Sequence, residues 1–213
     1  RVVSPSTAND AYWMIQDAVR SPDPVIFLEP KAKYWMKGDV DSAIADYQQA
    51  IKLDPRLTTA FANRGVALGI KGDSDRAFAD FDQAVKLNPS HDLAFYNRAL
   101  ALREKGDLDR SAADFGKAIQ LDPKNALAYN NRGLVYRSKG DLDRAIADFD
   151  QATKIDSTLG MAFNNRGVAL GQKGETDRAI ADFDAAIKVD ANEFRAYNNR
   201  GFAWRNKGEL DRA

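Results

Sequence analysis

Several residue types that would indicate chemistry are scarce in this chain of 213 residues. It has no cysteine, which excludes disulfide frameworks and thiolate metal sites. Its single histidine, His91, lies in a turn between repeats, where we expect a surface residue. Lysine plus arginine numbers 31, as does aspartate plus glutamate; a net charge near zero argues against nucleic acid or an anionic membrane as partner. No apolar run reaches the length of about 18 residues that indicates a membrane span. We therefore expect no catalysis, cofactor, metal, nucleic acid or membrane.

What the sequence has in abundance is repetition. Lys-Gly followed by Asp or Glu returns every 34 residues, at Lys37, Lys71, Lys105, Lys139, Lys173 and Lys207. A fixed period without insertion indicates one supersecondary unit stacked on itself. We expect a degenerate copy over about 31–57, full copies over 58–91, 92–125, 126–159 and 160–193, and a truncated copy over 194–213.

Each copy is predicted to be a hairpin of two helices, shown best by residues 126–159. Apolar residues recur at helical spacing in both halves. Gly140 is expected to end the first helix in the left-handed conformation, and Asp141 to cap the second, which ends near Ile155. Small residues, Gly133 and Ala145 among them, stand where the two helices would touch.

These columns resemble the tetratricopeptide repeat. The matching residues in this copy are Tyr129, Gly133, Tyr136, Ala145 and Phe149. The resemblance covers about 31–213 and implies an all-α fold, a right-handed α-solenoid of stacked helical hairpins. One departure is regular: arginine replaces the usual leucine before the glycine, at Arg64, Arg98, Arg132, Arg166 and Arg200.

That arginine has a structural interpretation. An aspartate stands 16 residues later on the antiparallel partner helix, giving the couples Arg64/Asp80, Arg98/Asp114, Arg132/Asp148 and Arg166/Asp182. We expect an ion pair inside each hairpin.

The signal for function is a column of asparagines, at Asn63, Asn97, Asn131, Asn165 and Asn199. Asparagine is unfavourable in a helix interior, because its amide competes with the backbone. The resemblance implies that this face lines a concave groove in which the amides hold an extended peptide through donor and acceptor together. Further candidates for the groove are Tyr96, Asn130, Asn164, Asn198, Leu127, Leu134, Arg103 and Arg137, with Met161 and Val168 adding apolar contact.

Two other interpretations of the asparagines stay open. They could hydrogen-bond between neighbouring repeats, or simply descend from one duplicated ancestor. The chaperone-tail type of tetratricopeptide domain clamps a terminal carboxylate with lysine and asparagine, and no lysine stands in these columns.

Residues 1–30 break the period and are predicted to form a short irregular or βαβ-like segment: a strand at Val2-Val3, a helix to about Arg20 and a strand at 25–28. Residues 2–40 resemble an internal piece of the beta subunit of the branched-chain 2-oxoacid dehydrogenase, a thiamine-diphosphate enzyme, without the cofactor-binding residues. The two resemblances overlap at 37–41, so we hypothesise a chimera joined there. Pro30 is expected to shorten the first helix of the first copy to about 31–37, followed by a second helix over 42–53.

The preferred interpretation is a non-enzymatic scaffold that binds a peptide or partner protein in the groove. The alternatives are a dehydrogenase beta-subunit fragment with an appended repeat array, and a purely structural or self-associating repeat protein. Self-association is prompted by Tyr197, Phe202 and Trp204, which we expect to be exposed on the truncated last copy. The chain starts at Arg1 with no apparent signal peptide, and we expect a cytoplasmic location.

Overall fold

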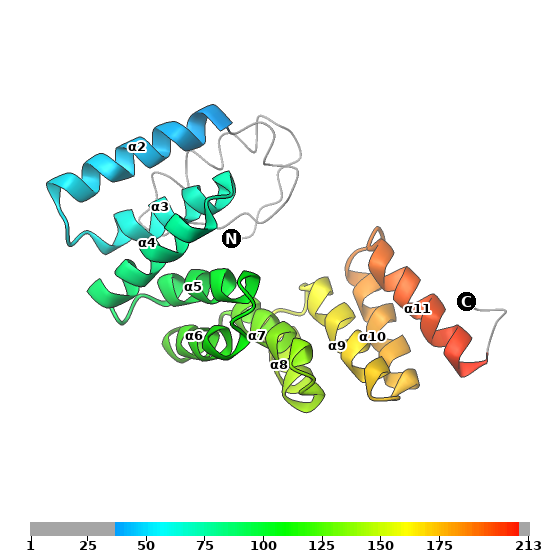
Figure 1. The fold of residues 1–213 in the computed structure, drawn as a ribbon. Coiled ribbons are helices and arrows are strands. Elements are labelled where there is room, and N and C mark those ends of the chain that lie inside the picture. Colours follow the sequence, from blue (N-terminus) through cyan, green and yellow to red (C-terminus); the bar gives the residue numbers. More distant parts are fainter. Residues whose placement is uncertain (1–36, 209–213) are drawn as a thin grey trace. The chain divides into compact units, whose positions relative to one another are not determined.

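The computed structural model describes residues 37–208, and every regular element in that part of the chain is an α-helix (Figure 1). The helices are α2 (Lys37–Leu53), α3 (Thr58–Lys71), α4 (Ser74–Leu87), α5 (Asp92–Glu104), α6 (Leu108–Leu121), α7 (Ala126–Ser138), α8 (Leu142–Ile155), α9 (Gly160–Gln172), α10 (Thr176–Val189) and α11 (Phe194–Lys207). The first helices of successive hairpins, from α3 to α11, begin 34 residues apart. The all-α fold of repeated hairpins is therefore confirmed.

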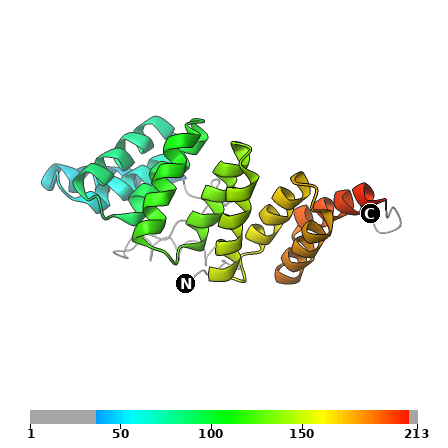
Figure 2. The same cartoon turned by 90° about the horizontal axis from the view of Figure 1, so that it is seen from below.

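The chain divides into two compact units, residues 1–94 and 95–213. In the first unit α3 packs against α4 and also against α2. In the second unit each helix from α6 to α11 packs against its neighbour in the sequence, and Figure 2 shows α9 and α10 side by side. The first helices also touch one another, α7 with α9 and α9 with α11. One face of the second unit is thus built from first helices alone.

Glycine ends the first helices as expected. Gly140 has a φ of 80°, the left-handed region that favours glycine, and its counterparts Gly72, Gly106, Gly174 and Gly208 have φ values of 80–90°. The N–H of Asp141 then donates to the carbonyl of Tyr136 at 2.9 Å. The Asp141 carboxylate accepts the N–H of Arg144 at 3.1 Å, which caps α8.

A close contact between glycine and phenylalanine joins the two helices in three of the four full hairpins, and Ala99 replaces the glycine in the hairpin of α5 and α6. A Cβ built on Gly133 would lie 2.7 Å from the Cε1 atom of Phe149, which is fully buried. The same contact joins Gly65 to Phe81 and Gly167 to Phe183. A side chain at these glycines would force the two helices apart.

The predicted ion pairs are present in all four full hairpins. Arg132 donates through Nε and Nη2 to the two carboxylate oxygens of Asp148, at 2.8 and 2.7 Å. Asp148 is only 5% exposed, and its hydrogen bonds are the main cause that raises the pKa of Arg132. Because an unpaired buried carboxylate is costly, the couple keeps α7 and α8 in register.

Some of these arginines also reach the preceding hairpin. Arg166 pairs with Asp182 in its own hairpin, and its Nη1 atom donates to Asp150 of the preceding one at 2.9 Å. The position of Asp150 is occupied in α6 by Gly116. The carboxylate that would link α6 to Arg132 on α7 is therefore missing.

One predicted boundary is wrong. The first copy is expected to have a first helix that ends at about residue 37 and a second helix over 42–53, but α2 begins at Lys37 and includes Gly38. Glycine adopts helical dihedrals as well as left-handed ones, so its presence alone does not end a helix. The predictions for residues 1–30 and for the first helix over about 31–37 lie, apart from Lys37, outside the described residues.

Candidate functional site

Asn131 is bonded on all sides by the helices around it. Its Nδ2 atom donates to the hydroxyl of Tyr96 on α5 and to the carbonyl of Leu127 on its own helix, both at 2.9 Å. Its Oδ1 atom accepts from Nη1 of Arg103 on α5 at 2.8 Å. The amide thus joins α5 to α7 and keeps little free hydrogen-bonding capacity.

The next asparagines in the column repeat this link. The Nδ2 atom of Asn165 on α9 donates to the side-chain Oδ1 atom of Asn130 on α7 at 2.9 Å, and Nδ2 of Asn199 on α11 donates to Oδ1 of Asn164 on α9 at 2.9 Å. The Nδ2 atom of Asn130 also lies 3.8 Å from the sulfur of Met161. Hydrogen bonding between neighbouring repeats, one of the open interpretations, is therefore observed at three successive junctions of the second unit.

Several candidate residues prove less accessible than expected. Tyr96 and Asn97 are each 4% exposed, Asn130 1% and Asn164 8%. For Asn130 and Asn164 the reason is the packing of first helices, which places each amide against the next helix. Asn198, by contrast, is exposed.

Asn63 is the column's member in the first unit, and it differs from the others. Its Oδ1 atom is buried and has no hydrogen-bond partner among the described residues. Among the described residues it therefore lacks the compensating bond that Asn131 has, and a buried polar atom without such a bond is unfavourable.

Burial also perturbs the hydroxyl of Tyr96. The low-polarity surroundings raise its pKa to about 12, although the Arg103 charge and the Asn131 hydrogen bond act in the opposite direction. Tyr96 additionally meets Phe115 edge-on, with ring centroids 5.6 Å apart. Its hydroxyl therefore stays neutral at ordinary pH as the acceptor for Asn131.

Apolar side chains remain exposed beside these amides. Leu127 on α7 is 41% exposed, Met161 on α9 48% and Phe202 on α11 47%. Leu134 and Val168 are half-buried, because each packs partly into a core cluster. We call this surface of α7, α9 and α11 the first-helix face. Phe202 was missed among the groove candidates, although it follows Val168 by one 34-residue period.

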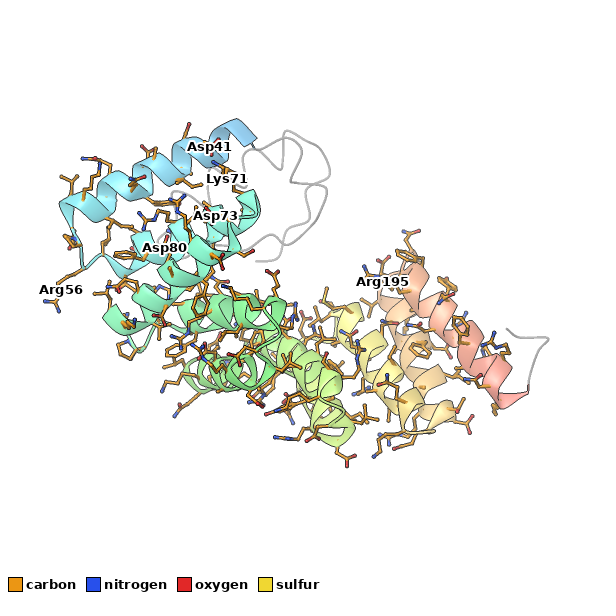
Figure 3. All side chains as sticks on the ribbon, in the orientation of Figure 1. Asp41, Arg56, Lys71, Asp73, Asp80 and Arg195 are labelled. Atoms are coloured by element: carbon orange, nitrogen blue, oxygen red, sulfur yellow. The ribbon has the colours of Figure 1, made fainter. Side chains whose placement is uncertain are left out.

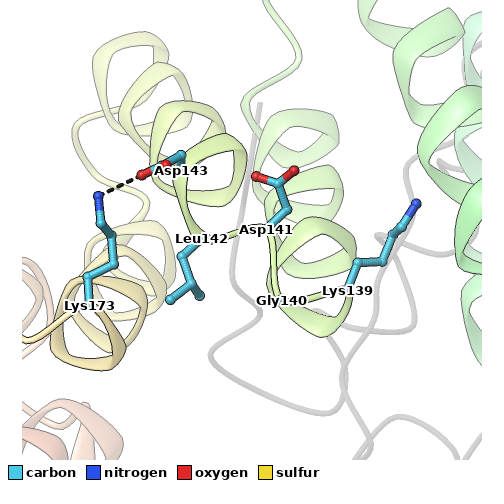
Figure 4. A pocket seen from close by; sticks show the side chains of 6 residues that line it. All are labelled: Lys139, Gly140, Asp141, Leu142, Asp143 and Lys173. Atoms are coloured by element: carbon cyan, nitrogen blue, oxygen red, sulfur yellow. Dashed lines mark hydrogen bonds and ion pairs between the residues drawn. The ribbon is translucent and has the colours of Figure 1, made fainter.

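Ion pairs also link successive repeats near the Lys-Gly-Asp turns, where the surface is slightly hollowed. A shallow hollow between two repeats is shown in Figure 4 and is lined by Lys139, Gly140, Asp141, Leu142, Asp143 and Lys173. Lys173 pairs with Asp143 at 2.6 Å, and Lys139 pairs with Asp109. In the first unit Lys71 pairs in the same way with Asp41 at 2.6 Å (Figure 3). These contacts link successive repeats and leave the two lysines of the hollow engaged.

Between residues 37 and 208 the single histidine has a structural contact, and neither a metal-binding cluster nor a membrane-spanning helix is found. His91 accepts the backbone N–H of Ala94 through Nδ1 at 3.3 Å, a helix-capping contact. No three acidic or histidine side chains there lie close enough together to hold a metal ion. None of the helices there combines the length and apolar character of a membrane span.

Comparison with solved structures supports the fold. The MamA structure superposes with a TM-score of 0.69 at 26% identity, covering 80% of this chain and 99% of that one. The structure titled "YrrB: a TPR protein with an unusual peptide-binding site" has a TM-score of 0.67 at 21% identity, covering 78% and 86%.

The resemblance to dehydrogenase beta subunits is confirmed over a short stretch. The pyruvate dehydrogenase E1 component subunit beta of Leifsonia xyli is 64% identical over 42 residues, and the 3-methyl-2-oxobutanoate dehydrogenase subunit beta of Mycobacterium tuberculosis is 51% identical over 43. Each match covers 20% of this chain and 12% of the relative. These matches are consistent with the proposed chimera.

Family models match most of the chain. A tetratricopeptide repeat model matches residues 63–120, 96–159 and 164–213, and a second TPR repeat model matches 33–72. With the 34-residue hairpins and the glycine–phenylalanine contact in three of them, these matches establish that the chain belongs to the tetratricopeptide repeat family.

Proposed function

We propose that this chain is a non-enzymatic interaction scaffold whose first-helix face binds an extended peptide segment of a partner protein. The observation that carries the proposal is the set of Leu127, Met161 and Phe202, each more than 40% exposed on neighbouring first helices. Exposed apolar side chains that gather on one face mark interaction surfaces more often than scattered ones do.

Only some of the asparagine amides beside these residues can hydrogen-bond to the backbone of a bound peptide. Asn131 is fully engaged, but no hydrogen bond reaches Oδ1 of Asn165 within the described part of the chain. That oxygen can accept a backbone N–H from a peptide lying across α9. The proposal therefore assigns Asn165 two tasks: its Nδ2 atom joins α9 to α7, and its Oδ1 atom receives the ligand.

The test begins with selection of binders from a random 12-residue peptide library on the full chain. The dissociation constants of selected peptides are then measured for the double variant Leu127→Ser/Met161→Ser. The matched control is Ile155→Ser/Val189→Ser, which removes two apolar side chains exposed by 36% and 40% near the ends of second helices.

We expect the first double variant to weaken binding by about tenfold or more, since two exposed apolar contacts are lost. The control is expected to bind as the parent chain does. Equal losses in both variants, or failure of the selection to yield any specific binder, would contradict the proposal.

Self-association is a second candidate, favoured by exposed aromatic residues on α11. Phe194 is 72% exposed and Tyr197 44%, and Phe202 lies on the same helix; Trp204, also expected to be exposed, is half-buried against a core cluster. The proposed occupant is a second copy of the chain. Sedimentation equilibrium should show a concentration-dependent mass that Phe194→Ser/Tyr197→Ser reduces to that of a monomer, whereas a strict monomer for the parent chain would exclude the idea.

A further inference from the structure

Arg137 differs from every other half-buried arginine of the described residues. Five of those arginines, at 64, 98, 132, 166 and 200, pair with aspartates, and Arg103 donates to Asn131. Arg137 makes no hydrogen bond, ion pair or ring contact with any described residue. A guanidinium that is partly removed from water without a partner is an unfavourable arrangement, which a bound anion would relieve.

The position of Arg137 is fixed by the repeat. It stands one period after Arg103, whose guanidinium crosses from α5 to Asn131 on the following first helix. One period later the corresponding residue is Gly171, which is exposed and has no long side chain. Arg137 therefore lies at the α7–α9 side of the first-helix face, and the bond seen at Arg103 is not repeated between Arg137 and Asn165. Burial accordingly lowers the pKa of Arg137, with no nearby carboxylate to oppose it.

We propose that Arg137 anchors a side-chain carboxylate, an aspartate or glutamate, of the peptide that binds the first-helix face. This inference rests on the proposed function and specifies the ligand. Arginine suits the task because its planar fork can meet both carboxylate oxygens at once.

The surroundings of Arg137 favour an acidic side chain within the peptide over a terminal carboxylate. Leu134 lies one turn earlier on α7, and Leu100 on α5 and Val168 on α9 occupy the equivalent repeat positions, each half-buried. Since α7 is bonded to α5 on one side and to α9 on the other, an extended segment crossing α7 has apolar contacts both before and after its acidic residue. The expected ligand is therefore an apolar segment interrupted by one acid.

The experiment uses the peptides selected on the parent chain. Each is synthesised with acetylated and amidated ends, in its original form and with its acidic residue replaced by the matching amide. Dissociation constants are measured by fluorescence anisotropy for the parent chain, Arg137→Gln and Arg137→Lys. The control is Arg178→Gln, which removes an exposed arginine of α10 that pairs with Glu175 outside the first-helix face.

We expect the acidic form to bind the parent chain about tenfold more tightly than the amide form, because a charge-assisted bond is replaced by a neutral one. In Arg137→Gln this difference should vanish, and in Arg137→Lys it should be partly kept. In Arg178→Gln it should remain in full. Unchanged thermal melting of each variant shows that folding is not the cause.

Three results would overturn the inference while leaving the proposed function intact. One is a set of specific binders to the first-helix face without any recurring acidic residue. Another is an acid preference that Arg137→Gln and Arg178→Gln leave equally strong. The third is a requirement for a free peptide carboxylate, in which case capping the C-terminus abolishes binding. An absence of binders to this face removes the proposed function as well.

Discussion

Replacing Asn131 by alanine tests whether the asparagine column holds the repeats together. The change removes the two bonds that join α5 to α7, to Tyr96 and from Arg103. Each such bond contributes about 0.5–1.5 kcal/mol, and a buried group left without its partner costs about 1–3 kcal/mol. The loss is offset by the better helix propensity of alanine, up to ~0.7 kcal/mol. We expect a net loss of about 1–3 kcal/mol in the free energy of unfolding.

Asn63→Ala is the matched comparison, because it changes the same column where the side-chain Oδ1 atom is buried and has no partner within residues 37–208. The propensity gain is the same, up to ~0.7 kcal/mol, and no bond to Oδ1 is lost. We expect this variant to be as stable as the parent chain or slightly more stable.

Both variants are compared with the parent chain by urea unfolding, followed by circular dichroism at 222 nm. Thermal unfolding gives a second measure, with a shift of about 2–4 °C per kcal/mol for a chain of this size. The reasoning fails if Asn131→Ala is as stable as the parent chain, or if Asn63→Ala is the more damaging of the two. In the first case the three bonds of Asn131 contribute nothing beyond what water supplies.

Three further predictions concern single positions. Gly133→Ala would place a methyl group 2.7 Å from a ring atom of buried Phe149 and should lower the unfolding free energy by about 1–3 kcal/mol in the same urea assay. Gly116→Asp should add about 0.3–1 kcal/mol, since a Cβ there lies 3.5 Å from Nη1 of Arg132; a loss of stability would show that this junction does not accept the carboxylate. Tyrosinate absorbance at 295 nm should show one late titration near pH 12, absent in Tyr96→Phe. Because the folded pKa of Tyr96 exceeds the unfolded value of about 10, its contribution to stability is present below pH 10 and lost as the pH rises through 12.

Much of the fold follows from local signals within one period. Gly140 is a left-handed helix end and Asp141 a cap because both depend on residues a few positions away. The contact of Gly133 with Phe149 is nearly as local, since a short turn makes the two helices antiparallel. Such features could be predicted because the same residues recur at the same positions in several copies of the repeat.

The contacts between repeats were harder to predict. The bond from Asn131 to Tyr96 spans 35 residues, and it depends on the distance and rotation between neighbouring first helices, which no single hairpin specifies. The asparagine column could therefore be recognised as unusual, while its bonding partner could not. The same holds for Arg137, whose missing partner becomes apparent only when the neighbouring helices are in place.

Methyl NMR of the full chain with a selected, unlabelled peptide tests the central claim most directly. With leucine, valine, isoleucine and methionine methyls labelled, we expect the peptide to shift the signals of Leu127, Leu134 and Met161 on the first-helix face. The methyls of Ile155 and Val189, exposed near the ends of second helices, should stay in place. Shifts concentrated on Ile155 and Val189, with the three first-helix signals unmoved, would contradict the account.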